Sequence, residues 1–260
     1  LASVMDVRMK DGNNQHYHVS GGIGLISSRI SVEGPIIRNK GSFLLTARRT
    51  YADLFLKLSS DPLLNNNQLY FYDINAKANY QLNDNNRLFI SAYAGRDVFS
   101  FFDRFNMNWG NITATVRWNH IFNNRLFSNT SFIYSDYGYK VGINLAENSF
   151  SLLSQINNVQ LKHDYQYFLT AQNTLSFGIQ ATHHRITPGQ LSTESTLFQP
   201  FKLQEKYAFE SSLYMTNNWK PNYHWNVSYG VRGNIFSLLG GGDFYTYLND
   251  GTIQTSFYDY

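Results

Sequence analysis

Cysteine is absent from this 260-residue sequence, and charge is scarce, since Asp, Glu, Lys and Arg together make up only 15% of the residues. The lack of cysteine excludes disulfide scaffolds, cysteine-based zinc sites and thiol catalysis. Charged residues make up about 25% of an ordinary soluble domain. Much of the polarity here must therefore come from uncharged side chains, among them the 29 asparagines.

Several other features are missing as well. The 21 Lys and Arg residues are too evenly balanced by 18 Asp and Glu for a nucleic-acid footprint, and no nucleic-acid-binding motif is present. The chain starts at Leu1 with no leader pattern, so we expect it to be processed or a fragment. No run of about 18 apolar residues occurs, which excludes a transmembrane helix. A mean hydropathy of -0.36 is typical of a soluble protein, but this average cannot detect a barrel in which every second residue faces lipid.

What the sequence does have is a large aromatic content, 17%, which excludes disorder, and an alternation of polar and apolar residues from end to end. Segment 70–82 shows the alternation most clearly. One of its faces carries Tyr70, Tyr72, Ile74, Ala76, Ala78, Tyr80 and Leu82, and the other is polar except for Phe71. Segments 111–121, 158–169, 175–182 and 225–232 repeat this pattern, with His163 as a misfit on an apolar face. The period of two predicts strands throughout.

Eleven or so strands are predicted by this alternation. Their ranges are 16–24, 27–35, 42–51, 69–82, 87–97, 110–121, 126–138, 157–169, 174–186, 205–219 and 224–235. Many of these strands match the roughly 9 to 11 residues that a tilted membrane strand needs. Short turns alternate with long loops, which we place at 52–68, 98–109, 139–156, 187–204 and from 236 onward. Outer-membrane barrels have short turns on one side and long loops on the other.

The positions of aromatic and charged residues indicate the same architecture. Large aromatic residues lie on the apolar faces near the short turns, which is the position of an interfacial girdle: Tyr80, Trp118, Tyr167, Trp219 and Trp225. The charged residues lie on the opposite faces: Lys77, Arg117, Lys162, Asp164, Glu210 and Arg232. The fold class is therefore all-β, a transmembrane antiparallel up-and-down barrel with lipid outside and water inside.

The first fifty residues resemble a known family. ASVMDVRMK, from Ala2 to Lys10, is similar to the last strand of the plug domain of TonB-dependent outer-membrane receptors. HYHVSGGIGLISSRISVEGPIIRNKGSFLLTARRTYADLF, which follows Gln15, resembles their first three barrel strands. The resemblance implies residues 1–10 as the end of the plug, 11–15 as a linker, and 16–260 as the N-terminal half of a barrel of about 22 strands.

The resemblance also implies a function in the bacterial outer membrane. The expected function is the import of a scarce or bulky solute, namely a siderophore, cobalamin, glycan or peptide. TonB with ExbB and ExbD would drive the import, and a surface lipoprotein is a possible further partner. The alternative is a passive porin of about twelve strands, closed by residues 251–260.

Candidate site residues are few. Phe99, Phe101, Phe102 and Phe105 are expected in a long loop, where exposed aromatics suggest ligand or partner contact or packing within the protein. His16 and His18 lie two apart without a nearby third ligand, so we predict no metal site. Asp136 and Asp164 are isolated, and no catalytic motif occurs. The sequence therefore predicts a protein that is not an enzyme and needs no cofactor.

Overall fold

The computed structural model describes residues 9–65, 67–102, 104–145, 148–193, 200–240, 242–248 and 253–259. The long strands are β1 (His18–Ile23), β2 (Ser27–Ile37), β3 (Gly41–Thr50), β4 (Gln68–Asn83), β5 (Asn86–Phe101), β6 (Phe105–Ile121), β7 (Leu126–Leu145), β8 (Asn148–Thr170), β9 (Asn173–Thr193), β11 (Lys206–Trp219) and β12 (Val227–Leu239). Shorter elements are α1 (Asp53–Lys57), α2 (Pro62–Asn65), β10 (Phe201–Lys202), β13 (Gly242–Tyr247) and β14 (Ile253–Asp259).

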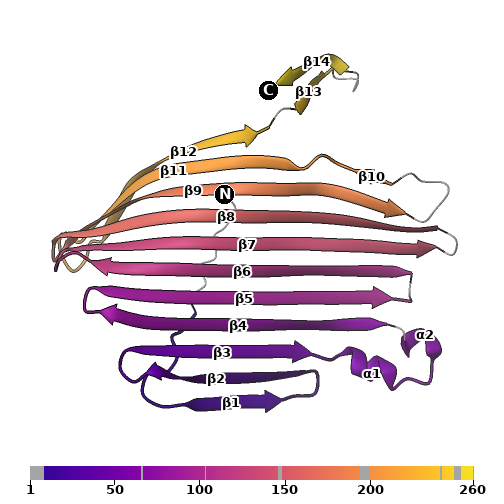
Figure 1. Cartoon of the computed structure of the whole chain (residues 1–260), viewed down its shortest axis with the longest axis horizontal. Helices are drawn as coiled ribbons and strands as arrows, with labels where there is room; N and C mark the ends of the chain where they lie inside the picture. The colour runs from indigo at the N-terminus through magenta and orange to yellow at the C-terminus, as the bar shows by residue number, and fades with distance from the viewer. Residues whose placement is uncertain are drawn as a thin grey trace.

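One antiparallel sheet contains almost all of these strands, in the order in which they occur along the chain (Figure 1). Each strand from β1 to β9 pairs with the next, β11 follows β9, and β12 is the last strand, while the short β10 pairs with β9. The meander predicted from the alternation is therefore confirmed, and each predicted strand overlaps one of the long strands. No helix among the described residues is long and apolar enough to cross a membrane.

Four of the predicted long loops are wrong in extent, and the one from 236 onward begins within β12, which runs to Leu239. Most of 98–109 belongs to β5 and β6, which pair from Asn86↔His120 to Phe101↔Phe105. Likewise, β7 and β8 stay paired up to Leu145↔Asn148, and β9 runs on to Thr193. Alternation continues at 105–109 and 139–145, but there apolar residues such as Met107 and Val141 lie on the concave face, because a strand that extends past the lipid no longer needs an apolar convex side. The long connection at 52–68 is confirmed, and it contains α1 and α2.

The sheet is open in the described part of the chain. β1 pairs with β2 alone and β12 with β11 alone, so both are edge strands. β14, which includes most of the segment proposed to close a twelve-stranded barrel, pairs with β13 in a separate two-stranded sheet. The pairing therefore does not support the closed porin alternative.

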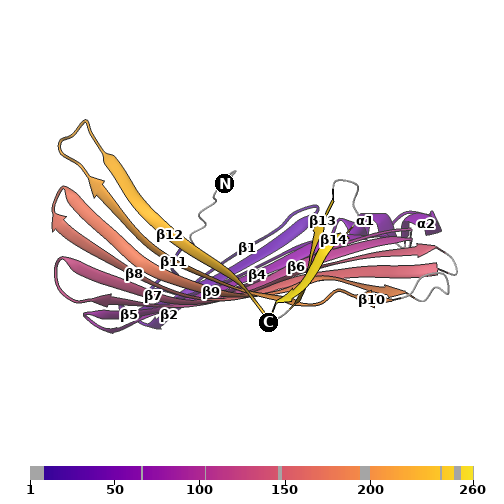
Figure 2. The same cartoon turned by 90° about the horizontal axis from the view of Figure 1, so that it is seen from above.

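The sheet curves strongly, which gives it a concave and a convex face (Figure 2). Burial is the inverse of that in a soluble domain. Among the described residues the buried apolar side chains are Leu44 and Ala208, whereas Ser42, Asn79, Ser131, Thr182 and Ser212 are buried and polar. The convex face exposes large apolar residues such as Ile112, Leu161, Ile179, Leu213, Val231 and Ile235. A single sheet with an apolar outer face matches the predicted lipid-facing barrel wall.

Asparagine builds several short turns at one end of the sheet. The Asn83 side-chain oxygen accepts the N–H of Asn85 at 3.0 Å, and that of Asn123 accepts the N–H groups of Arg125 and Leu126 at 2.9 and 3.1 Å. Asn222 caps the turn before β12 in the same way. Since an asparagine side chain mimics a backbone turn, these contacts account for part of the high asparagine content.

Candidate functional site on the concave face

The charged residues of the concave face lie in rows that cross the sheet. Arg117, Ser131, Lys162, Gln180 and Ser212 are successive cross-strand partners from β6 to β11. This register places Lys162, Arg117 and Arg232 on the side opposite the exposed apolar residues, as predicted. Four charged residues line a hollow of about 920 Å³ together with Met9 and Phe89: Lys77, Arg117, Lys162 and Asp164.

Residues 9–15 cross this concave face next to β2, β3 and β4. The Lys77 ammonium donates to the Met9 carbonyl at 2.6 Å and lies 2.7 Å from an Asp11 carboxylate oxygen. Gly12 passes so close to β3 that a Cβ there would lie 2.0 Å from the Phe43 carbonyl oxygen. Glycine is required at this position because only a residue without a side chain allows so close an approach.

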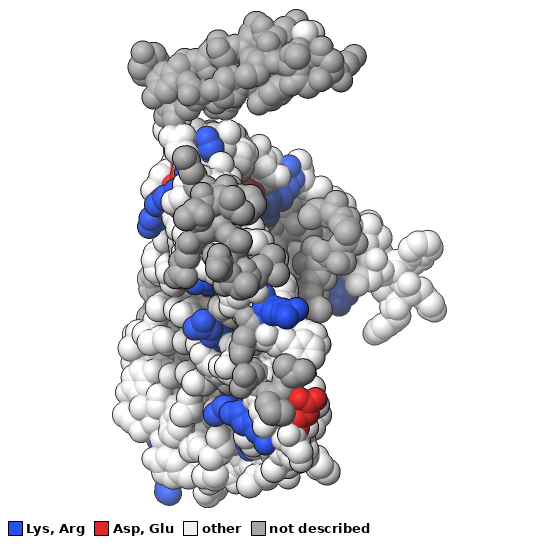
Figure 3. All heavy atoms as spheres, turned by 90° about the vertical axis from the view of Figure 1, so that its right-hand side faces the viewer, with Lys and Arg blue, Asp and Glu red and all other residues white. Residues whose placement is uncertain are grey.

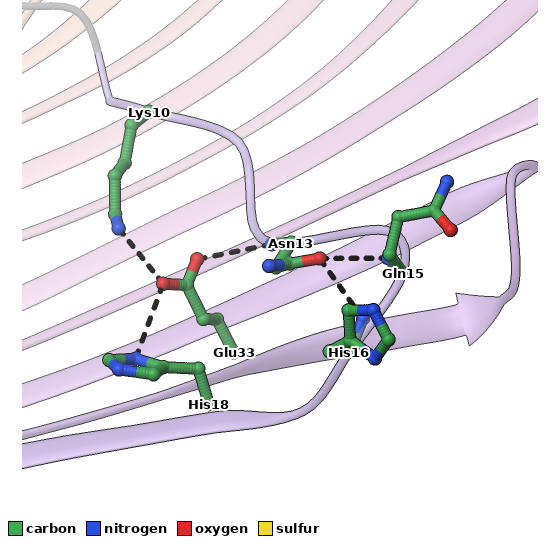
Figure 4. Close-up of polar contacts among 6 residues, drawn as sticks. All are labelled: Lys10, Asn13, Gln15, His16, His18 and Glu33. Atoms are coloured by element: carbon green, nitrogen blue, oxygen red, sulfur yellow. Dashed lines mark hydrogen bonds and ion pairs between the residues drawn. The ribbon is translucent and has the colours of Figure 1, made fainter.

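Glu33 fixes the beginning of this segment (Figure 4). One of its carboxylate oxygens accepts a hydrogen bond from Lys10 Nζ at 3.1 Å, and the other accepts the Asn13 N–H at 3.1 Å. His18 Nδ1 lies 3.7 Å from the same carboxylate. Asn13 in turn accepts the N–H groups of Gln15 and His16. The predicted linker, 11–15, is thereby tied to the second strand of the sheet.

A second cluster surrounds Asp164 between β8, β11 and β12. The Tyr214 hydroxyl donates to Asp164, and Lys162 Nζ lies 3.0 Å from the same carboxylate. The Arg232 guanidinium stacks 5.1 Å from the Tyr214 ring centre and donates to Ser212 at 2.6 Å. Gly178 leaves room for this contact, because a Cβ there would lie 2.8 Å from the Tyr214 hydroxyl. The sequence did not single out Tyr214, because it lies on a mainly polar face like many others.

Arginine also stacks on phenylalanine in the same hollow. The guanidinium carbons of Arg117 and Arg87 lie 4.4 and 5.3 Å from the Phe89 ring centre. Arg87 also donates to the buried Asn79 side chain at 2.6 Å. Cations held against an aromatic face keep their charge in a partly desolvated place. The concave face is thus suited to binding polar or charged groups.

The predicted phenylalanine cluster does come together, but not in a long loop. Phe99 and Phe101 lie in β5, Phe105 begins β6, and Phe102 lies in the turn between them with a φ of 51°. Ring centres are 4.0 Å apart for Phe101 and Phe102, and 6.0 Å for Phe99 and Phe105. The buried Asn67 side chain accepts the Phe102 N–H at 2.6 Å and so fixes the turn.

The histidines do not form a metal centre in the described residues, where no group of three or more potential ligands occurs. His184 points to the concave face and contacts Asn158 at 2.8 Å, whereas His183 lies beside Tyr207 on the other face. His163, the misfit on the convex face, is paired there with the Thr130 hydroxyl at 2.8 Å. A polar residue on an apolar face is tolerated when its hydrogen bond is made locally.

A curved antiparallel sheet with a polar concave face and an apolar convex face has the geometry of part of the wall of a transmembrane β-barrel. No family model and no curated sequence matches the chain. Solved structures do match, and the sequence resemblance to TonB-dependent outer-membrane receptors is confirmed at the level of the fold.

Three of these structures describe the likeness. The pyoverdine outer membrane receptor of Pseudomonas aeruginosa aligns with 96% of this chain at 13% identity and a TM-score of 0.66. The ferric preacinetobactin receptor of Acinetobacter baumannii aligns with 88% at 11% identity and a TM-score of 0.63, and a copper transporter with 96% at 8% and 0.66. The chain spans only 42 to 44% of the length of these proteins. Sequence identities this low establish similarity of fold alone.

Proposed function

We propose that this chain forms part of the barrel of an outer-membrane receptor that imports a scarce or bulky solute. The observation that carries the proposal is the separation of charge between the two faces of one sheet. Lys77, Arg117 and Asp164 line a hollow on the concave side, while the convex side exposes apolar residues to a lipid environment. Open edges cannot persist in lipid, so β1 and β12 would each pair with further strands of a complete barrel.

Receptors of pyoverdine and of ferric preacinetobactin, together with a copper transporter, are among the structures that resemble this chain. By analogy with these proteins, we infer a metal chelate or a metal as the solute in preference to a glycan, peptide or cobalamin. Import would require TonB with ExbB and ExbD, because an outer membrane has no energy source of its own. A surface lipoprotein remains a candidate partner without a described contact.

The segment at residues 9–15 supports a role for a plug. Residues 1–8, most of the predicted last plug strand, lie outside the described residues, but the segment that follows them is bound to the concave face by Lys77 and Glu33. A plug entering the barrel at this point would be held by ionic contacts whose partners on the segment, Lys10 and Asp11, are exposed to water. Such contacts break and re-form at lower cost than a packed apolar interface.

The four phenylalanines at the β5–β6 turn are proposed as a ligand-contact surface at the rim. Phe101 and Phe102 expose 45% and 37% of their surface, which is unusual for rings on a strand end held in place by Asn67. Exposed aromatics on a rigid support supply contact area at little entropic cost. An incoming chelate with flat or lipophilic groups would meet them before it reaches the charged hollow.

The test is uptake by the full-length protein in cells. Iron-55 supplied as ferric pyoverdine and ferric preacinetobactin should accumulate in cells that express the protein and have TonB, and should fail to accumulate without TonB. The quadruple variant with alanine at the four phenylalanines should raise the half-saturating concentration several-fold. Uptake that is indifferent to TonB, together with steady single-channel conductance in planar bilayers, would establish the passive channel and refute the receptor.

A further inference from the structure

A hollow of about 350 Å³ opens on the convex face, away from the concave site. Its floor contains Gly110 of β6 and Gly138 of β7, which are direct cross-strand partners. Since neither glycine has a side chain, the pair leaves a depression in the wall. Ile112, Arg96 and Lys140 line its border.

The hollow lies where the apolar band ends. On β5 the convex-face positions that lead up to it are Leu88, Ile90, Ala92 and Ala94, and the next is Arg96. At about 3.3 Å per residue and a strand tilt of about 40°, the stretch from Asn86 to Arg96 rises roughly 25 Å, the height of a barrel's apolar band. Arg96 is therefore the first charged residue of β5 on this face, at the level of lipid headgroups.

Arg96 and Lys140 are exposed cations without an acidic partner in the described structure. No salt bridge there involves either residue, and Arg96 donates to the neutral Asn108 side chain at 3.1 Å. The adjoining hollow between β8 and β9 differs, because Arg185 and Lys202 both contact Glu205 there, at 2.9 and 3.2 Å.

Acidic charge in the first hollow is limited to Asp136, which accepts a hydrogen bond from the Gln155 side chain at 2.8 Å. Two cations that have no acidic partner among the described residues therefore face one hydrogen-bonded carboxylate. The space-filling view onto this end of the sheet shows Lys and Arg at several places among the described residues (Figure 3). The charge of the site favours an anion.

We propose that this hollow binds the phosphate of a phosphorylated membrane lipid, with the acyl chains lying along the apolar convex face below it. β5 and β7 are two strand spacings apart, about 10 Å, so the long side chains of Arg96 and Lys140 can reach one phosphate group. Arginine binds phosphate through two N–H groups and lysine as a point charge. Ile112, immediately below, offers the apolar contact that a soluble phosphate would not use. The inference rests on the proposed membrane location.

The experiment is native mass spectrometry of the full-length protein released from detergent micelles containing lipid A, the diphosphorylated probe, or the same lipid stripped of its phosphates. Wild-type protein should retain lipid A at least tenfold more than the dephosphorylated lipid. The double variant Arg96→Gln and Lys140→Gln should lose that preference. The control, Arg125→Gln and Lys220→Gln, removes the same charge from turns at the opposite end of the sheet and should keep it.

The possible outcomes distinguish failure of the lipid site from failure of the proposed membrane location. A heat-modifiable gel shift of all three proteins reports insertion, and its absence in the wild type would refute the proposed function. Normal insertion with equal retention of lipid A by wild type and double variant would overturn the lipid site. Displacement of lipid A by inorganic phosphate in excess would overturn it too, because it would assign the cations to a simple anion site.

Discussion

The concave and convex faces of the sheet differ in how they treat polar groups, although the same strands contribute to both. On the concave face, Lys77, Lys162 and Asp164 are held by ion pairs or hydrogen bonds, and small polar residues are buried. On the convex face, apolar side chains stay exposed, and the misfit His163 is paired with Thr130. Alternation at a period of two lets one strand meet two solvents at once.

The comparison shows that the burial of a side chain has a different cause on each face. Ser42 and Asn79 are buried because residues 9–15 cover the concave face there, and Asn79 donates to Ser42 at 2.8 Å. Val116 is 42% exposed because lipid, and not protein, is its expected neighbour. A protein core of the usual kind is not needed when a membrane covers the apolar side.

Moving a charge from one face to the other is expected to have the largest effect. Val116→Lys or Ala76→Lys puts an ammonium on the lipid side near mid-membrane, at about 2 to 4 kcal/mol, and should block stable insertion. Thr115→Lys and Asn75→Lys, one position away in each strand, lie on the polar concave face and should be tolerated. Heat-modifiable gel migration measures the folding yields, and equal yields for the two pairs would contradict the assignment of faces.

A clash at the clamped segment should have the next largest effect. Gly12→Val places a side chain where a Cβ already lies 2.0 Å from the Phe43 carbonyl oxygen, so residues 9–15 must leave β3 at a cost of about 1 to 3 kcal/mol. Proteolysis of this segment should become faster. Gly22→Val is the control, because a Cβ there meets nothing within 4 Å. Unchanged proteolysis in Gly12→Val would show that the segment does not rest on the concave face.

Asn67 offers a smaller test, at the rim. Asn67→Ala removes the acceptor of the Phe102 N–H and should destabilise the β5–β6 turn by about 1 kcal/mol. Hydrogen exchange should rise several-fold in residues 99–105 and remain unchanged in β4 below the rim. If exchange at Phe102 stays as slow as in the wild type, the turn does not depend on Asn67.

The smallest expected effect is a pH dependence at Glu205, outside the strands. Hydrogen bonds from Tyr207, Lys202 and Arg185 hold the pKa of the Glu205 carboxyl below its ordinary value of 4.5. Because the folded pKa is lowered, these contacts stabilise the segment fully above pH 4.5 and weaken as pH falls through the lowered pKa. Hydrogen exchange at residues 201–206, corrected for intrinsic rates, should increase below pH 4.5. Glu205→Gln should abolish that change, and a wild-type response that matches the variant would refute it.

Much of the fold was predictable because alternation and turns are local. Residues 70–82 alternate over their whole length, and β4 spans Gln68–Asn83. The predicted strand ends at the short turns agree best with the structure, since asparagines such as Asn83 and Asn123 fix these turns. The predicted ends of β5 to β9 at the opposite side come too early, because residues such as 139–145 stay paired while their apolar side chains lie on the concave face instead of the convex one.

The site was predictable in part. The four phenylalanines form a cluster in the sequence, and their rings do lie together, but only the pairing of β5 with β6 places them at the end of a strand pair and not in a long loop. Tyr214 and Asp164 lie on different strands, and nothing in either local sequence indicates their contact. The pairing of Gly110 with Gly138 in the convex hollow is likewise not indicated by the local sequence around either residue.

The sequence by itself determined the strands, their two faces and the end of the sheet with short turns, because each depends on neighbours within a few residues. Tertiary structure decided which residues meet: Lys77 with Asp11, Gly110 with Gly138, and Tyr214 with Asp164. Cross-strand register sets these contacts, and register depends on every hairpin between the partners. Whether a charged group is paired or free for a ligand is therefore a property of the assembled sheet.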